Sequence, residues 1–433
     1  MWLAMVRRAA FLALMVAIPN AGLAPVAMPP VHAIFVGGSM PPVDVLGVDE
    51  AHGTLLAETH NPTRIVAITL ADGVTRRVID VADDETVPQV ALDATTEQAV
   101  VAHSTPTTRS TTLTVYDLVH GTTVHTATLL CCAETLVVAV RSNRAFLIGL
   151  PMAFSAARGL TLTAAAMPLG TVVATSTIEA RSVVASAVDD PDNRMFLIVE
   201  PPLSAGVASG GPAASDELMT VDATTGVVIR TTPLGGLPRL IIVDPRTHRA
   251  FVVGTRGSPV AMVDATTGGV STMIPGASIP DRIYTAPTAI DTRRGRFYIA
   301  GVSGVSAYDA STGAPRGFVR LDGNAVIGSL AVDERTGHLY AGVIGAGYSN
   351  GGSLLVVTTY VGVLDVATGR ARYYPVGRAQ RPARAVSPDV DQMRAPALTV
   401  DALGDRLLLA GYFNASGPAG RGNTVGVLDL RAL

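Results

Sequence analysis

Short apolar runs that end in aspartate recur along the chain. Seven of the eight copies end in Asp, and one carries Arg141 where the others have Asp; the copies are VDVLGVD (43–49), PQVALD (88–93), TLVVAVR (135–141), VVASAVD (183–189), PRLIIVD (238–244), APTAID (286–291), GSLAVD (328–333) and ALTVD (397–401). A tight turn and a second run rich in β-branched and aromatic residues follow each copy, as in AFVVGT (250–255). Short apolar runs bounded by turn residues are typical of β-strands. Each copy therefore predicts a β-hairpin.

A second hairpin follows the first after a spacer of variable length. It is clearest in LMTVDATTG (218–226), VAMVDATTG (260–268) and VSAYDASTG (305–313), each of which precedes a more polar run. Successive copies of the first run end 42 to 68 residues apart, with no helical periodicity between them. Four short strands at such a period are typical of a β-propeller blade. The sequence predicts an all-β fold, a single β-propeller of four-stranded blades, eight by repeat count with seven as the alternative.

The two ends of the chain are predicted to close the ring together. The eighth unit stops at VGVLDLRAL (425–433), before its fourth strand. An open edge there would invite aggregation. The segment AIFVGG (33–38) is the candidate to fill it, with residues 34–36 pairing with residues 425–428.

The hexapeptide VDATTG occurs twice, at 221–226 and 263–268. Its Asp side chain can accept hydrogen bonds from backbone amides further along the turn, and Gly226 or Gly268 supplies the positive φ that closes such a hairpin. In DPRTHR (244–249), Asp244 and the preset φ of Pro245 build the preceding turn in the same way. We interpret these Asp residues as turn builders; the alternative is a ligand or a catalytic carboxylate.

These turn motifs carry a family resemblance. VDATTG and DPRTHR are similar to the paired hairpins of the YVTN-repeat, YncE-like propeller family, and the resemblance covers residues 43–433. It implies the propeller fold and an extracytoplasmic location. It implies no particular function, because such repeats are structural and occur in proteins of many roles.

The first residues read as a leader. Arg7 and Arg8 precede a short apolar run at 9–18, and four prolines end it, which is the pattern of a signal peptide. Cleavage is expected after Ala24 or Ala33. We place the leader at 1–33 and the propeller at 34–433, which predicts a secreted or envelope-associated protein with no transmembrane helix in the mature chain; a retained membrane anchor is the alternative.

Composition narrows the chemistry. Charged residues make up 15% of the chain and the formal net charge is −3, so nothing indicates a nucleic acid partner. All 32 basic residues are Arg, which excludes lysine-based Schiff-base chemistry. The only Trp lies in the leader, so tryptophan docking motifs of quinoprotein propellers are missing, and no nucleophile elbow or phosphate loop occurs.

Three groups of residues have side chains that could hold a ligand. His52, His248 and His338 occupy equivalent turns of separate units, so they cannot converge on one ion. Asp189, Asp190 and Asp192 form an acidic loop that could take Ca²⁺, with a solvated turn as the other reading. Cys131 and Cys132 are expected to be free thiols, with a strained vicinal disulfide or intermolecular pairing as alternatives. No metal or cofactor is predicted.

The variable loops predict where binding occurs. Connections between strands 2 and 3 and between successive blades share one face and carry every irregular insertion, and loops on a rigid scaffold are where binding usually takes place. The expected contacts are Arg282, Tyr284, Tyr348, Asn350, Tyr412 and Asn414. The leading hypothesis is a monomeric binding module for a peptide, a glycan or another envelope protein. The alternative is a lactonase-like or streptogramin-lyase-like enzyme with a site at the channel mouth.

Overall fold

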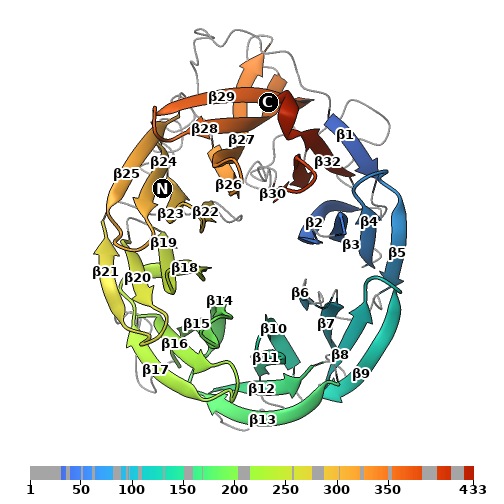
Figure 1. Cartoon of the computed structure of the whole chain (residues 1–433), viewed down its shortest axis with the longest axis vertical. Helices are drawn as coiled ribbons and strands as arrows, with labels where there is room; N and C mark the ends of the chain where they lie inside the picture. Colours follow the sequence, from blue (N-terminus) through green and yellow to red (C-terminus); the bar gives the residue numbers. More distant parts are fainter. Residues whose placement is uncertain are drawn as a thin grey trace, which may run out of the picture.

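The protein is an eight-bladed β-propeller (Figure 1). The structure is a computed structural model, and it describes residues 31–35, 40–49, 52–60, 64–80, 89–93, 96, 98–105, 110–129, 132–150, 159–167, 169–202, 215–255, 258–275, 287–301, 303–321, 326–349, 354–382, 397–410 and 424–433. Eight four-stranded antiparallel sheets are arranged in a ring, as the repeat count predicts. No helix in this part of the chain is both long and apolar enough to cross a membrane.

The first four blades follow one another along the chain, each with its strands in sequence order from the inside outward. Blade one has β2 (Met40–Asp49), β3 (Thr54–His60), β4 (Arg64–Thr69) and β5 (Thr75–Asp80); blade two has β6 (Gln89–Asp93), β7 (Gln98–Thr105), β8 (Ser110–Asp117) and β9 (Thr122–Leu129); blade three has β10 (Cys132–Ala139), β11 (Arg144–Leu150), β12 (Leu160–Ala166) and β13 (Thr171–Ile178); blade four has β14 (Ser182–Asp189), β15 (Arg194–Glu200), β16 (Glu217–Asp222) and β17 (Val228–Pro233).

The last four blades continue this order, except that the final blade takes its outer strand from the start of the chain. Blade five has β18 (Leu237–Asp244), β19 (Arg249–Thr255), β20 (Val260–Asp264) and β21 (Val270–Ile274); blade six has β22 (Thr288–Asp291), β23 (Arg296–Ala300), β24 (Gly304–Asp309) and β25 (Pro315–Arg320); blade seven has β26 (Val326–Asp333), β27 (His338–Ser349), β28 (Leu354–Asp365) and β29 (Arg370–Pro382); blade eight has β30 (Ala397–Asp401), β31 (Arg406–Ala410), β32 (Thr424–Asp429) and β1 (Val31–Phe35), and the 3₁₀ helix η3 (Leu430–Ala432) follows β32.

Burial within a blade explains the hydrophobic pattern. The second strand is buried on both faces by neighbouring blades, so β19 reads RAFVVGT with only its first residue partly exposed. The fourth strand forms the outer rim, and every residue of β17 is accordingly exposed or partly exposed. The apolar core therefore lies between adjacent blades. Phe251 of blade five and Phe297 of blade six, for example, stack with ring centroids 4.4 Å apart.

The ring is closed by the two ends of the chain, as predicted. β1 pairs antiparallel with β32, with Ile34 opposite Val425 and Val31 opposite Leu428. Because β1 begins at Val31, the leader boundary expected after Ala33 falls inside this strand. Cleavage after Ala24 would leave β1 whole.

One detail of the predicted alignment is wrong. The aspartate that ends each inner strand pairs with the first residue of the second strand, as Asp189 does with Arg194. In blade three the residue paired with Arg144 in this way is Ala139, not Arg141. Arg141 lies within the turn, and the strand-ending aspartate is replaced by alanine.

Candidate functional site

The two faces of the ring differ in construction. One face, the turn face, carries the tight turns between the first and second and between the third and fourth strands. The other, the loop face, carries the connections between the second and third strands and between successive blades. The hairpins of the turn face are bonded internally and to the neighbouring blade.

The repeated hexapeptide builds turns, as predicted. In blade five the carboxylate of Asp264 accepts hydrogen bonds from the backbone N–H of Thr267 (2.9 Å) and from its hydroxyl (3.1 Å). Gly268 and its counterpart Gly226 take φ of 67° and 74°. The pKa of Asp264 is lowered, and the hydrogen bond from the Thr267 N–H is the largest cause.

The aspartate that ends the inner strand also caps its turn. In blade five, Asp244 is fully buried; its Oδ1 accepts from the Arg246 N–H (3.0 Å) and its Oδ2 from the Thr247 hydroxyl (2.7 Å). Asp333 in blade seven makes the same pair of bonds, with Arg335 N–H and the Thr336 hydroxyl. These carboxylates are therefore occupied within their own turns.

Arginines in the same turns connect one blade to the next. Arg246 of blade five donates to the carbonyl oxygens of Thr292 (2.9 Å) and Arg293 (2.6 Å) in blade six. Arg294 of blade six in turn donates to the carbonyl oxygen of Glu334 in blade seven (2.7 Å). The turn face is held together by side chains that reach from blade to blade.

Blade four departs from this pattern. Its turn reads DDPDN, so the position that supplies the Arg246 N–H in blade five is occupied by Pro191, which has no N–H. The position of Thr247 is taken by Asp192. Asp189 is fully buried, yet its Oδ1 has no hydrogen-bond partner among the described residues.

His248 of blade five completes a cluster with these two carboxylates. Its Nδ1 lies 3.1 Å from Asp189 Oδ2 and 3.2 Å from Asp192 Oδ2. The Thr266 hydroxyl of blade five donates to Asp192 Oδ2 (3.0 Å). Burial raises the pKa of Asp189, while its hydrogen bond with His248 acts in the opposite direction. Three potential metal ligands, all within 4.8 Å of one another, thus meet between blades four and five.

The cluster differs from the calcium loop that the sequence suggested. Asp189 and Asp192 do come together, but Asp190 turns to blade three, where its Oδ1 accepts from the Arg141 N–H (3.3 Å). His248 replaces it, although sequence reasoning set the turn histidines aside as unable to reach one another. His248 instead meets the carboxylates of the adjacent blade. The sequence signals for the cluster were Pro191 and Asp192, because the corresponding positions of other turns supply hydrogen-bond donors to the strand-ending aspartate.

The predicted contacts of the loop face are mostly not located. Tyr348 lies in β27, where its backbone pairs with Leu355. The others, Arg282, Tyr284, Asn350, Tyr412 and Asn414, fall outside the described residues, as does Cys131. Cys132 is the first residue of β10.

In blade seven, three of the four strands extend past the inner strand on the loop face. β27 and β28 pair as far as Ser349 and Leu354, and β29 follows β28 to Pro382. The inner strand β26 ends its pairing with β27 at Ile344. Residues 345–349, 354–358 and 378–382 therefore form a three-stranded ribbon beyond the body of the blade.

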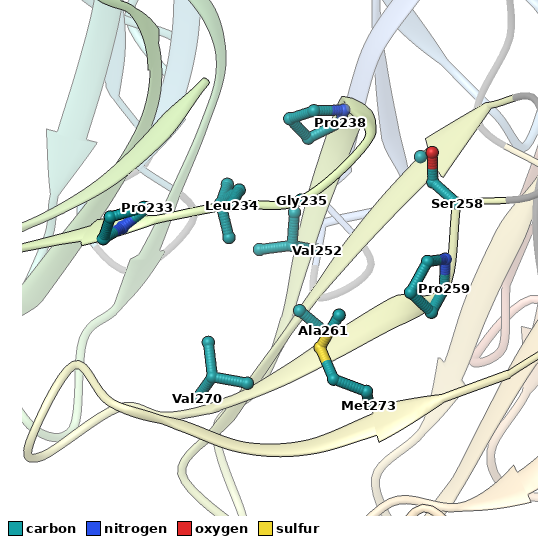
Figure 2. A pocket seen from close by; sticks show the side chains of 11 residues that line it. Pro233, Leu234, Gly235, Pro238, Val252, Ser258, Pro259, Ala261, Val270 and Met273 are labelled. Atoms are coloured by element: carbon teal, nitrogen blue, oxygen red, sulfur yellow. The ribbon is translucent and has the colours of Figure 1, made fainter. Parts of the chain in front are cut away.

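A small apolar pocket on the loop face of blade five is too small for an organic ligand (Figure 2). Its volume is about 30 Å³, the scale of a single water molecule. It is lined by Pro233, Leu234, Gly235, Pro238, Val252, Gly254, Ser258, Pro259, Ala261, Val270 and Met273. The Ser258 hydroxyl in its lining is already hydrogen-bonded within the protein, because it accepts from the Leu237 N–H (3.1 Å) and donates to the Thr255 carbonyl (2.6 Å).

No protein-family model and no curated protein sequence matches the chain.

Proposed function

We propose that this propeller is an extracytoplasmic binding module that captures an extended segment of a partner protein on its loop face. The observation that carries the proposal is the ribbon of blade seven, which extends β27, β28 and β29 past the end of β26. The leader-like N-terminus and the resemblance of the turn motifs to YVTN-repeat propellers support the extracytoplasmic location.

The inner edge of the ribbon is suited to strand addition. Along residues 345–349, β27 pairs with β28 on one side, and no described strand pairs with it on the other. An unpaired edge presents N–H and C=O groups that an extended peptide can bind as an added strand. Gly345 and Gly347 leave little side-chain bulk beside that edge.

Loops of the neighbouring blades would supply side-chain contacts. One connection joins β21 to β22 of blade six and another joins β31 to β32 within blade eight, and the strand ends that these connections join lie on the loop face on either side of blade seven. They contain Arg282, Tyr284, Tyr412 and Asn414. Tyrosine and arginine often dominate protein interfaces, so these residues remain our predicted contacts.

The enzyme alternative has less support. An acid–base site in the channel needs titratable side chains on the inner strands. Among the inner-strand side chains that the structure describes, Arg239 is the only titratable one apart from the strand-ending aspartates. The aspartates of blades five and seven are occupied by turn hydrogen bonds.

The proposal is tested by shortening the ribbon. Gly345 pairs with Thr358, so residues 346–357 can be replaced by an Asn-Gly turn that keeps the lower hairpin. The matched control replaces residues 106–109 by Asn-Gly on blade two, where Thr105 pairs with Ser110. Peptides selected from a displayed random library against the intact protein should bind the blade-two variant and lose binding to the ribbon variant, with melting temperatures nearly unchanged.

Backbone pairing is tested with the same peptides. Strand addition uses the N–H of alternate residues, so N-methylation should abolish binding in one alternating register and leave it nearly intact in the other. Binding that survives ribbon removal, or that is lost equally in both registers, would contradict the proposal.

A further inference from the structure

We propose that Asp189, Asp192 and His248 bind one divalent transition-metal ion that links blade four to blade five. The site lies on the turn face, so it is independent of the binding surface proposed for the loop face. Zn²⁺ is the probe that the donor set favours, because imidazole nitrogen with carboxylate oxygen is a common zinc ligand combination.

The spacing of the three donor atoms fits a coordination sphere. His248 Nδ1 is 3.1 Å from one carboxylate oxygen and 3.2 Å from the other. Tetrahedral ligand atoms bound to zinc at about 2.0–2.2 Å lie about 3.3–3.6 Å apart. The two His248 distances are close to that value, and all three ligand atoms lie within 4.8 Å of one another, so small side-chain shifts would bring them around one metal ion.

The cluster is poorly satisfied without a cation. An imidazole Nδ1 carries at most one hydrogen, yet it faces two carboxylate oxygens. Asp189 is fully buried with its Oδ1 unpartnered, because Pro191 removes the N–H that the corresponding turns provide. A buried carboxylate oxygen without a hydrogen-bond partner is costly. A divalent ion would neutralise both carboxylates, including that of the buried Asp189.

The backbone also holds His248 in an unusual conformation. Its φ is +51°, and the equivalent positions of blades three and four hold Asn143 and Asn193, while blades six and seven have glycine. Glycine adopts positive φ without steric penalty, and asparagine and histidine adopt it more often than most other residues. A histidine at this position places an imidazole against the carboxylates of blade four.

The site is accessible to solvent, so a metal ion can enter it. The side chains of His248 and Asp192 are 38% and 30% exposed, whereas Asp189 is buried beneath them. The three protein ligands leave room for water as a further ligand on the exposed side. The Thr266 hydroxyl, which donates to Asp192 Oδ2, would hold that carboxylate in place.

The test measures Zn²⁺ binding to the full chain by calorimetry and thermal melting, after treatment with EDTA and dialysis. The wild type should bind one equivalent and melt at a higher temperature with ZnCl₂. Asp192→Thr and His248→Asn should each weaken binding at least 100-fold. His52→Asn removes a turn histidine whose Nδ1 lies 2.9 Å from Asp49 Oδ2, away from the proposed site, so this variant should bind Zn²⁺ like the wild type.

Asp192→Thr also distinguishes a metal site from a simple ion cluster. It restores the threonine cap that Thr247 provides to Asp244 in blade five (2.7 Å). In EDTA this variant should melt at or above the wild-type temperature, and in ZnCl₂ it should melt below it. No Zn²⁺ binding, wild-type binding in both site variants, or an equal melting shift with CaCl₂ would overturn the proposal.

Discussion

Gly268 of blade five lies against Thr220 of blade four. A Cβ atom at Gly268 would lie 3.0 Å from Thr220 Cβ and closer still to its hydroxyl oxygen, and the glycine has φ of +67°. The Thr232 hydroxyl of blade four donates to the Gly268 carbonyl (3.1 Å). The second copy of the hexapeptide thus both closes a turn and fits against the preceding blade.

Replacing Gly268 should therefore cost more than turn strain alone. Gly268→Val is expected to lower the free energy of unfolding by about 2 kcal/mol or more, from positive φ and from the clash with Thr220. Gly295 has φ of +61° with nothing within 4 Å of an added Cβ, so Gly295→Val isolates the strain. Urea unfolding of both variants checks this; equal losses would show that the contact with Thr220 contributes nothing.

The closing strand gives a second prediction. A chain that starts at Pro25 keeps all of β1, whereas one that starts at Ile34 keeps only the residues paired with Val425 and Thr424. The shorter chain should melt at a lower temperature and aggregate faster, because most of the β32 edge is then unpaired. Calorimetry and light scattering measure both effects. Identical behaviour of the two chains would mean that β1 is dispensable.

The stacked rings of Phe251 and Phe297 should be energetically coupled across two blades. Their centroids are 4.4 Å apart and their planes differ by 8°. In a double-mutant cycle with Phe251→Leu and Phe297→Leu, the coupling energy is expected to be about 0.5–1.5 kcal/mol. The free energies come from urea unfolding of the four proteins. Strict additivity would indicate that the rings contribute only their buried area.

Asp309 should make stability depend on acid pH. The Ser311 hydroxyl (2.6 Å) and the Arg316 guanidinium (2.6 Å) hold its pKa below the ordinary value of 3.8. The unfolded chain therefore takes up the proton at a higher pH than the folded chain, so this stabilisation is complete well above pH 3.8 and is lost as the pH falls through the folded pKa.

Asp309→Asn tests that sign. At pH 7 the variant should be less stable by about 1–2 kcal/mol, from weakened hydrogen bonds to a charged group. The difference from the wild type should narrow below pH 4. Ser311→Ala, which keeps the carboxylate, should show a smaller loss with the same direction of pH dependence. A difference that stays constant from pH 7 to pH 2 would contradict the assignment.

The repeat pattern predicted the fold because the sequence of each blade contains the same strand and turn motifs. The turn roles of Asp264 and Gly268 can be predicted without knowing which blade lies beside them, because turn chemistry depends on neighbouring residues in the chain. The closing pair of Ile34 and Val425 was also predictable, because the eighth unit lacks a strand and only one apolar segment remains to supply it.

The cluster at Asp189 was not predicted in full because it depends on which blades touch. Asp192 and His248 belong to different repeat units and occupy different positions within those units, so aligning the repeats does not bring them together. In the ring, however, the turns of adjacent blades are in contact. The alignment of Arg141 failed for a related reason. Letter patterns place it at the strand end, whereas strand register shows Ala139 there.

The pairing of β1 with β32 also has a consequence for how the chain folds. β1 precedes blade one and β32 belongs to blade eight, so the closing contact joins strands from opposite ends of the propeller sequence. Contacts of that kind form slowly. Blades one to seven each take all four strands from one continuous stretch of the chain, while blade eight needs both β1 and β32. We therefore expect ring closure to follow the assembly of the other blades, because it requires β32 to have been synthesised.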